Sequence, residues 1–193
     1  MKIAFQNVNG ICDDGKRAEV ENALRDLNYD LIFLLDTRLG EKKQKSQLQK
    51  EKWKPYFSGN RQGKRGIKAF LNPNSPIKVK KFHSDPQGNF LILECIIQDT
   101  PTVVTGIYGP NDDDTDWWTR LHNKIELLRY QNVIMGGDTN IILDHEKDSK
   151  GYKRVWYPNK RRLFNDWFDS DIYIDVYRDL YPHQEEYSKR YAD

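Results

Sequence analysis

Short apolar or alternating runs, each bounded by Gly, Pro, Asn or Asp, occur along most of the chain. Such runs are typical of β-strands, whereas apolar positions that repeat every three or four residues indicate helices. The pattern predicts strands at residues 2–8, 31–36, 54–58, 66–72, 77–83, 89–97, 102–109 and 132–136. It predicts helices at about residues 16–28, 113–130 and 158–169.

The order of these elements predicts the fold class, which is α/β. Strands in the middle of the chain have short connections that favour antiparallel pairs, including a hairpin turn at residues 98–101, while strand-helix-strand units occupy the first and last thirds. A sheet with helices on one face needs a second sheet on the other, so we expect two mixed β-sheets packed face to face. The alternative is a single doubly wound sheet, but the Gly-x-Gly-x-x-Gly motif of many such folds is missing from the sequence.

Length and composition limit the class of protein. A chain of 193 residues without repeats or linkers favours a single domain over residues 1–193. Charged residues make up 31% of it, and no apolar run approaches the roughly 20 residues that span a bilayer, so we expect no membrane association. No secretory signal is visible, and the spacing of Cys12 and Cys95 matches neither a metal site nor a disulfide framework. We therefore expect an intracellular protein with two reduced cysteines.

Charge is distributed unevenly along the sequence. Residues 41–84 contain 13 Lys or Arg and 2 Glu, a net charge of +11, although the whole chain carries only +2. A basic segment in an otherwise acidic chain suits a surface that faces a polyanion, because each neutralised phosphate releases condensed counterions. A solvated lysine-rich loop would explain the same charges, and charge alone does not separate these two interpretations.

Polar side chains stand at the ends of four predicted strands. After Gly136-Gly137 come Asp138 and Asn140, which alternate and therefore lie on one side of a sheet edge. A carboxylate and an amide placed in this way suit the activation of a water molecule. Three other strands end in the same manner, in Asn7 and Asn9, in Asp36 and Arg38, and in Tyr108. The acidic run at residues 112–114 precedes a predicted helix and favours helix capping over a calcium loop.

Four motifs carry a resemblance to a known superfamily. They are Asn-Val-Asn-Gly at 7–10, Leu-Leu-Asp-Thr-Arg at 34–38, Ile-Tyr-Gly-Pro-Asn at 107–111 and Gly-Gly-Asp-Thr-Asn at 136–140. Their order resembles the endonuclease/exonuclease/phosphatase superfamily, most closely the apurinic-like endonuclease domain of non-LTR (LINE-type) retrotransposons. The resemblance implies a four-layer αββα sandwich of the DNase I type. It also implies a nuclear protein that nicks DNA for target-primed integration, with the reverse transcriptase domain of the same polyprotein as its partner.

The resemblance also implies a role for each polar position. Asp36 and Asn9 would bind a divalent ion, Mg²⁺ or alternatively Mn²⁺, and Asp138 would orient or deprotonate the attacking water. Other positions match groups that hold the phosphate or complete the catalytic site, namely Asn140, Tyr108 and Asn7. Residues expected to contact the DNA backbone are Arg38, Arg61, Lys64, Arg65 and Ser188.

Two departures from the family pattern affect the expected activity. Asp36 replaces the usual glutamate, which draws the carboxylate back by roughly 1.5 Å and decides between direct and water-mediated coordination. The terminal Ser-Asp-His motif has no counterpart, and the four histidines at 83, 122, 145 and 183 are poor replacements. We therefore expect C-terminal strands to be missing and cleavage to be weak or absent. The alternatives are an impaired fold that only binds nucleic acid, or another phosphodiesterase of the same superfamily.

Overall fold

The computed structural model describes residues 1–50, 52–59, 62–144 and 157–184, and these divide into two compact units. The first unit contains residues 1–109 and 122–139, and the second contains residues 110–121 together with the described part of 140–193. The expectation of a single domain stays a prediction. None of the helices in the described ranges has the length and apolar character needed to cross a membrane.

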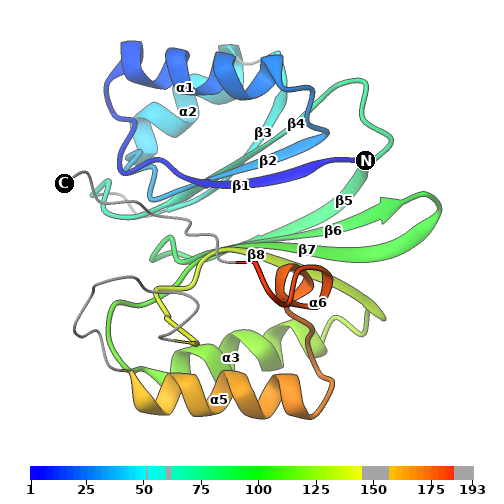
Figure 1. Ribbon diagram of the computed structural model, residues 1–193. Helices are drawn as coiled ribbons and strands as arrows, with labels where there is room; N and C mark the ends of the chain where they lie inside the picture. Colours follow the sequence, from blue (N-terminus) through cyan, green and yellow to red (C-terminus); the bar gives the residue numbers. More distant parts are fainter. Residues whose placement is uncertain (51, 60–61, 145–156, 185–193) are drawn as a thin grey trace. The chain divides into compact units, whose positions relative to one another are not determined.

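The first unit contains both β-sheets (Figure 1). Sheet A has the order β1-β2-β4-β3, and only its β1–β2 pair is parallel. Sheet B has the order β5-β6-β7-β8, and only its β7–β8 pair is parallel. The strands are β1 (Ile3–Asn7), β2 (Leu31–Leu35), β3 (Lys54–Ser58), β4 (Ile67–Leu71), β5 (Lys78–Ser84), β6 (Phe90–Ile97), β7 (Thr100–Tyr108) and β8 (Asn132–Asp138). All eight correspond to predicted strands.

Of the five helices in the described part of the chain, three were predicted. Predicted helices formed as α1 (Asp14–Asp26), α3 (Thr115–Glu126) and α5 (Pro158–Asp169), whereas α2 (Glu41–Lys50) and α6 (Val176–Leu180) were not predicted. Helices α1 and α2 cover the outer face of sheet A (Figure 1). Helix α3 begins in the second unit and ends in the first.

The two sheets pack face to face through one apolar cluster. Sheet A contributes Leu31, Phe33 and Leu35, and sheet B contributes Leu91 and Leu93, all at most 1% exposed. The opposite face of β2 packs against α1, so all five residues of this strand are buried. The prediction of two mixed, facing β-sheets flanked by helices is therefore confirmed, and the single doubly wound sheet is excluded.

Two glycines allow the sheets to approach closely near the ends of β1 and β8. A Cβ atom on Gly106 would lie 2.3 Å from Phe33 Cδ1, and one on Gly136 would lie 2.4 Å from Phe5 Cδ2. The two rings are neighbours in sheet A and stack with centroids 5.0 Å apart. Gly106 and Gly136 are likewise paired in sheet B, so each ring packs where a neighbouring side chain is missing. The interpretation that β8 stops at residue 136 was wrong, because the strand continues through both glycines to Asp138.

Two smaller predictions concern turns and caps. Gln98 and Asp99 form the two-residue turn between β6 and β7 with φ of 49° and 63°, the left-handed values of a type I′ hairpin. The predicted hairpin is confirmed, but its turn is shorter than residues 98–101 because β7 begins at Thr100. Asp114 accepts a hydrogen bond from the Trp117 amide at 2.9 Å, and Asp113 accepts one from the Lys160 amide at 2.9 Å. The acidic run thus caps α3, as expected, and it also caps the start of α5, which was not expected.

A buried ion pair connects α1 to sheet A. Lys68 of β4 is fully buried, and its Nζ donates to Glu21 Oε1 at 2.7 Å. Glu21 is only 2% exposed, and its second oxygen accepts from Arg25 Nη2 at 3.0 Å. Lys68 Nζ also lies 5.3 Å from the centre of the Phe70 ring. The carboxylate of Glu21 therefore pairs with two cationic side chains, one from α1 and one from sheet A.

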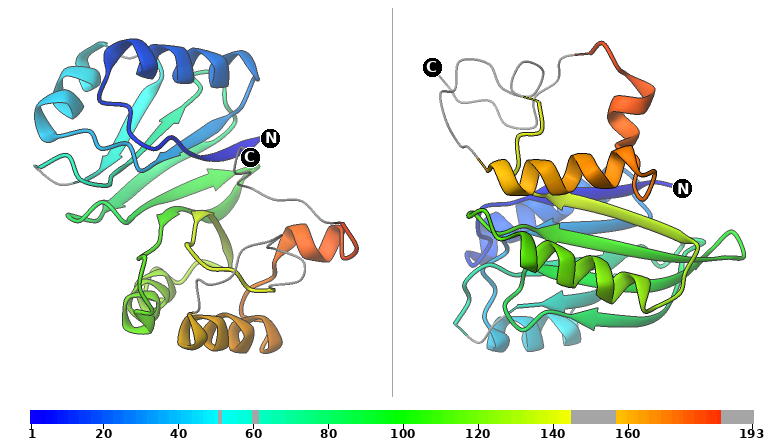
Figure 2. Two further views of the ribbon diagram at one scale, coloured as in Figure 1. Left: turned by 60° about the vertical axis from the view of Figure 1, so that its left-hand side comes forward. Right: turned by 90° about the horizontal axis from the view of Figure 1, so that it is seen from below.

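The second unit is organised around α5, which lies beside the first part of α3 (Figure 2). The rings of Trp118 and Phe164 meet edge to face with centroids 4.8 Å apart. Lys160 is fully buried; its Nζ donates to the carbonyls of Pro110 at 3.0 Å and Asn140 at 3.4 Å and lies 3.9 Å from the centre of the Tyr157 ring. Lys160 therefore holds together two segments of the unit that are distant in sequence.

Candidate active site at the strand ends

Asn7 and Asp138 meet where β1 and β8 end. Asn7 Nδ2 donates a hydrogen bond to Asp138 Oδ2 at 2.8 Å. Asn7 Oδ1 accepts the Asn9 backbone amide at 3.0 Å, which fixes the orientation of the side-chain amide. The contact follows from the fold. Asn7 lies two residues after Phe5 and shares its sheet face, and Asp138 lies two residues after Gly136 in the same way. Because Phe5 packs on Gly136, the two polar side chains also face each other.

Arg38 bridges two loops that follow β1 and β2. Its Nη2 donates to Asp36 Oδ2 and to Asn9 Oδ1, both at 2.7 Å, and its Nε donates to Asp36 Oδ1 at 3.2 Å. Asn9, Asp36 and Arg38 all have left-handed φ values, between 45° and 56°, which turn the backbone sharply after each strand. The ion pair raises the pKa of Arg38 further above its usual value.

Tyr108, at the end of β7, lies within electrostatic range of both carboxylates. Burial raises the pKa of its phenol above the usual value, and the negative charges of Asp36 and Asp138 raise it further, while Arg38 and Arg65 oppose the shift. Tyr108 is paired with Asp138 in the β7–β8 register. The phenol is therefore protonated at neutral pH and able to donate a hydrogen bond.

Asn89 is a site residue to which the sequence analysis gave no role. It is 1% exposed, its Oδ1 accepts from Arg65 Nη1 at 2.8 Å, and its carbonyl accepts the Tyr108 amide at 2.7 Å. The Asn89 amide in turn donates to Asp85 Oδ2 at 2.8 Å. Asn89 thus connects Arg65, one of the predicted DNA contacts, to the backbone of Tyr108. Its position in the Asp85-Pro86-Gln87-Gly88-Asn89 turn was the available signal.

The structure brings together six of the predicted site residues: Asn7, Asn9, Asp36, Arg38, Tyr108 and Asp138. Arg65 joins them through Asn89, and Lys64 is exposed beside it. Asn140 belongs to the second unit, where Lys160 contacts its carbonyl. Arg61 and Ser188 lie outside the described residues. The roles assigned to all of these residues stay predictions.

The histidines have other surroundings. His83 Nε2 lies 2.6 Å from Glu94 Oε1, and Tyr130 donates to the other oxygen of Glu94 at 2.8 Å. These hydrogen bonds hold the pKa of Glu94 below its usual value although burial acts in the opposite direction. His122 lies on α3, His183 is exposed in the second unit, and His145 falls outside the described residues.

The oxygen atoms of Asp36 and Asn9 fit a hard divalent cation by chemical type, because carboxylate and amide oxygens are preferred ligands of Mg²⁺ and Mn²⁺. Only one of the two residues carries a negative charge, and all three oxygens accept hydrogen bonds from Arg38. In the part of the chain that the structure describes, no cluster of three or more His, Cys, Asp or Glu residues could hold a metal ion. The candidate metal site is therefore a small one that keeps most of its ligands as water.

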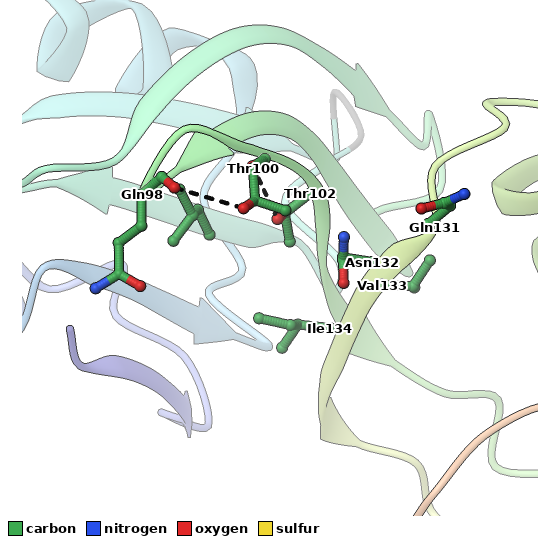
Figure 3. Close-up of a pocket in the computed structure, with 8 residues that line it drawn as sticks. Gln98, Thr100, Thr102, Gln131, Asn132, Val133 and Ile134 are labelled. Atoms are coloured by element: carbon green, nitrogen blue, oxygen red, sulfur yellow. Dashed lines mark hydrogen bonds between the residues drawn. The ribbon is translucent and has the colours of Figure 1, made fainter.

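A hollow of about 390 Å³ lies at the opposite end of sheet B (Figure 3). The hollow lies near the start of the β7–β8 pair, where Thr102 is paired with Asn132. Tyr108 and Asp138 are paired at the other end of the two strands, about 20 Å away. Its lining residues are Ile97, Gln98, Thr100, Thr102, Gln131, Asn132, Val133 and Ile134, which include no ionisable side chain. We assign no role to this hollow.

Comparison with known proteins agrees with this architecture. The structure is similar to the 3'-5' exonuclease NExo from Neisseria meningitidis, with 21% identity, a TM-score of 0.72, and coverage of 95% of this chain and 76% of that one. It is similar to an AP endonuclease from Archaeoglobus fulgidus, with 18% identity, a TM-score of 0.67 and coverage of 97% and 77%. It is also similar to the APE2 catalytic domain from Xenopus laevis, with 20% identity, a TM-score of 0.63 and coverage of 96% and 74%.

At these identities the likeness to solved structures shows the fold, which is the DNase I-like sandwich that the motifs predicted. The family itself is shown by the sequence. A profile described as "Endonuclease/Exonuclease/phosphatase family" matches residues 4–175 and so includes the strand ends that carry Asn7, Asp36, Tyr108 and Asp138. From the matched motifs and the fold, we conclude that this chain belongs to the endonuclease/exonuclease/phosphatase family.

Proposed function

We propose that this chain is a divalent-metal-dependent endonuclease that nicks DNA by hydrolysing a phosphodiester bond. The observation that carries the proposal is the hydrogen bond from Asn7 to Asp138, with the protonated phenol of Tyr108 in range of the same carboxylate. Family membership supports a hydrolytic reaction on a phosphate ester.

Each side chain has a defined task in this proposal. Asp138 orients the attacking water and accepts its proton, and Asn7 holds the carboxylate in a single orientation for that transfer. The phenol of Tyr108 donates to a phosphate oxygen as negative charge develops there. A divalent ion, Mg²⁺ or Mn²⁺, would be held by Asp36 and Asn9; such an ion polarises the phosphate and stabilises the departing oxygen.

DNA is the proposed substrate because of the basic segment. Residues 41–84 carry a net charge of +11, which suits the phosphates of a duplex better than a small phosphate ester. A structural relative, the 3' phosphatase NExo from Neisseria, is described as bound to a product DNA hairpin, with 21% identity and a TM-score of 0.62. Arg65, which is close to Tyr108, and the neighbouring exposed Lys64 are the residues that we propose for contact with phosphates near the cut.

We further propose that the nick serves target-primed integration of a LINE-type retrotransposon. The support is the order of the four motifs and their residue sequences, from Asn-Val-Asn-Gly to Gly-Gly-Asp-Thr-Asn. The nick would supply a 3′ hydroxyl to a reverse transcriptase domain of the same polyprotein. This role places the proposed activity in the nucleus.

A second candidate function is a nucleic-acid-binding module without cleavage. The specific observation in its favour is that Arg38 contacts every side-chain oxygen of the proposed metal ligands, while Asp36 is shorter than the usual glutamate. Such a protein would retain the basic surface and lose the reaction. Another phosphodiesterase of the same family would show the opposite, hydrolysis of a small ester without tight DNA binding.

Nicking of supercoiled plasmid separates these candidates. We expect slow conversion to open circles that requires Mg²⁺ or Mn²⁺ and is lost in Asp138→Asn, which keeps the shape of the side chain and removes its basicity. The affinity for duplex DNA should fall steeply as the salt concentration rises, in the unaltered chain and in Asp138→Asn alike. DNA binding that depends steeply on salt, without any nicking, would favour the binding module. Hydrolysis of a small phosphodiester with weak, salt-insensitive DNA binding would favour the third candidate.

A further inference from the structure

We propose that Arg38 is the resident counter-cation of the Asp36–Asn9 site, and that a divalent ion binds there only by displacing the Arg38 guanidinium. The inference deepens the proposed function, because it rests on the proposed metal ligands and concerns how their affinity for the ion is set. It makes Arg38 a residue that lowers ion affinity, in addition to its predicted contact with DNA.

The first observation is the completeness of the Arg38 contacts. One guanidinium reaches both oxygens of Asp36, at 3.2 and 2.7 Å, and the side-chain oxygen of Asn9, at 2.7 Å. The fork of the guanidinium matches a carboxylate, so these are charge-assisted hydrogen bonds of the stronger kind. An ion that coordinates the same oxygens must replace these bonds.

The second observation is the difference in burial between the two partners. The side chain of Asp36 is 5% exposed, whereas that of Arg38 is 48% exposed. A buried carboxylate needs a cationic or hydrogen-bonding partner, but the guanidinium can return to water when the bridge breaks. Arg38 is therefore the partner that leaves when another cation arrives.

The third observation concerns the backbone around Arg38, which is held in place. The Arg38 amide donates to the Arg65 carbonyl at 2.7 Å, and its own carbonyl accepts from Cys12 Sγ at 2.6 Å. The side chain instead passes over Gly10, where a Cβ atom would lie 3.2 Å from Arg38 Cδ. Rotation of the side chain is thus the available way to release the ligands, and it leaves the loop unchanged.

Charge determines the sign of the effect. A cation next to a carboxylate disfavours a second cation at the same group, by an amount that shifts a carboxyl equilibrium about tenfold or more at this separation. Removing the positive charge of Arg38 should therefore strengthen ion binding. The ion affinity of Arg38→Lys should lie between that of the unaltered chain and that of a variant without the charge, because a single ammonium lacks the fork that spans Asp36 and Asn9.

Titration with Mn²⁺, followed by electron paramagnetic resonance of the free ion, tests this directly and needs no DNA. We expect Arg38→Gln to bind Mn²⁺ about tenfold more tightly than the unaltered chain, with Arg38→Lys intermediate, and Asp36→Asn to lose binding. The matched control is Arg120→Gln, which removes the same charge from a side chain that is 67% exposed and lies 3.9 Å from its own partner, Asp114. Its Mn²⁺ affinity should equal that of the unaltered chain.

Thermal unfolding supplies the second readout. Without Mn²⁺, Arg38→Gln should unfold at a lower temperature than the unaltered chain, because Asp36 loses its partner, and saturating Mn²⁺ should restore more stability to this variant than to the unaltered chain. Equal or weaker Mn²⁺ binding in Arg38→Gln, with binding intact in the unaltered chain, would overturn this inference alone. Mn²⁺ binding by none of these proteins would overturn the proposed metal site as well.

Discussion

Asn7 and Asp138 are 131 positions apart in the sequence, yet their side chains are joined by a hydrogen bond of 2.8 Å. The Asn7 amide donates with its nitrogen and accepts the Asn9 backbone amide with its oxygen, so an aspartate at position 7 could not make both contacts. A carboxylate at position 7 could not donate to Asp138 and would repel it. The pair defines where the proposed reaction is centred, and it is the first target for mutation.

Replacement of Asn7 by alanine should lower the rate constant of plasmid nicking by about 10²- to 10³-fold, with a small effect on DNA affinity. The reason is that Asn7 no longer holds the Asp138 carboxylate in the orientation for proton transfer, so the general base is misplaced. Single-turnover nicking at saturating protein measures this rate. Asn132→Ala, at the opposite end of β8 from Asp138, is the control and should nick at the original rate. An equal loss in both variants would contradict the role of Asn7.

Replacement of Gly136 by alanine should destabilise the protein by about 1–3 kcal/mol, because the new methyl group overlaps the Phe5 ring. The urea midpoint of unfolding measures the loss. The double variant Gly136→Ala with Phe5→Leu should be less destabilised than the sum of its two single variants, since the smaller side chain relieves the overlap. Strict additivity would show that the ring and the glycine do not interact.

Replacing Glu21 and replacing Lys68 should lower the free energy of unfolding by different amounts. Glu21→Ala should destabilise the fold by about 3–5 kcal/mol, because it removes the carboxylate that pairs with the fully buried Lys68 and with Arg25. Lys68→Met should cost less, because Glu21 keeps Arg25 as a partner. Urea unfolding of both variants gives the comparison. A larger loss in Lys68→Met than in Glu21→Ala would contradict this order.

The raised pKa of Tyr108 predicts a specific effect of alkaline pH. A group with a raised pKa in the folded state favours folding in its protonated form, so its contribution is complete below the unfolded pKa, which is near 10, and is lost as pH rises through the higher folded value. The unaltered chain should therefore lose more stability above pH 10 than Tyr108→Phe does. Urea unfolding at several pH values measures this difference. Tyr56 gives a second test, because burial raises its pKa to about 12, so Tyr56→Phe should remove a loss of stability that begins near pH 10 and continues to about pH 12.

Lys64 and Arg65 should differ in their effects on DNA. Lys64→Gln should weaken duplex binding and reduce the slope of log affinity against log salt by about 1, while leaving the nicking rate at saturation unchanged. Arg65→Gln should reduce the slope similarly and also slow nicking, because Arg65 contacts Asn89, whose carbonyl positions Tyr108. Fluorescence anisotropy in a salt series and single-turnover nicking give the two values. Identical nicking rates in the two variants would contradict the link through Asn89.

Most of the fold could be predicted from the sequence, because its strands are apolar runs with clear turn residues. Strand β6, for example, was predicted at 89–97 and spans Phe90–Ile97. Helix α2 could not be predicted in this way. Leu48 is its only apolar side chain and is 56% exposed, while the helix is joined to the fold by polar contacts such as that from Gln44 to the Leu39 carbonyl. No apolar periodicity exists there to be detected.

The site could be predicted as a set of residues but not as a set of contacts. Alternation of side chains along each strand indicated which residues share an edge, since it depends only on the backbone. The bond between Asn7 and Asp138 depends on the register between two sheets, which the packing of Phe5 on Gly136 determines. The Arg38 bridge depends on left-handed turns at two non-glycine positions, Asp36 and Arg38, and such φ values are uncommon outside glycine.

The packing of Phe5 and Phe33 against two glycines has a consequence for natural variation in this chain. At this end the two rings pack directly against the backbone of the glycines, so a larger side chain at a glycine or a smaller one in place of a ring would change the distance from the Asn7 amide to the Asp138 carboxylate without altering either polar residue. Substitutions deep in the apolar interior should therefore tune turnover, and ring and glycine should be inherited as a unit.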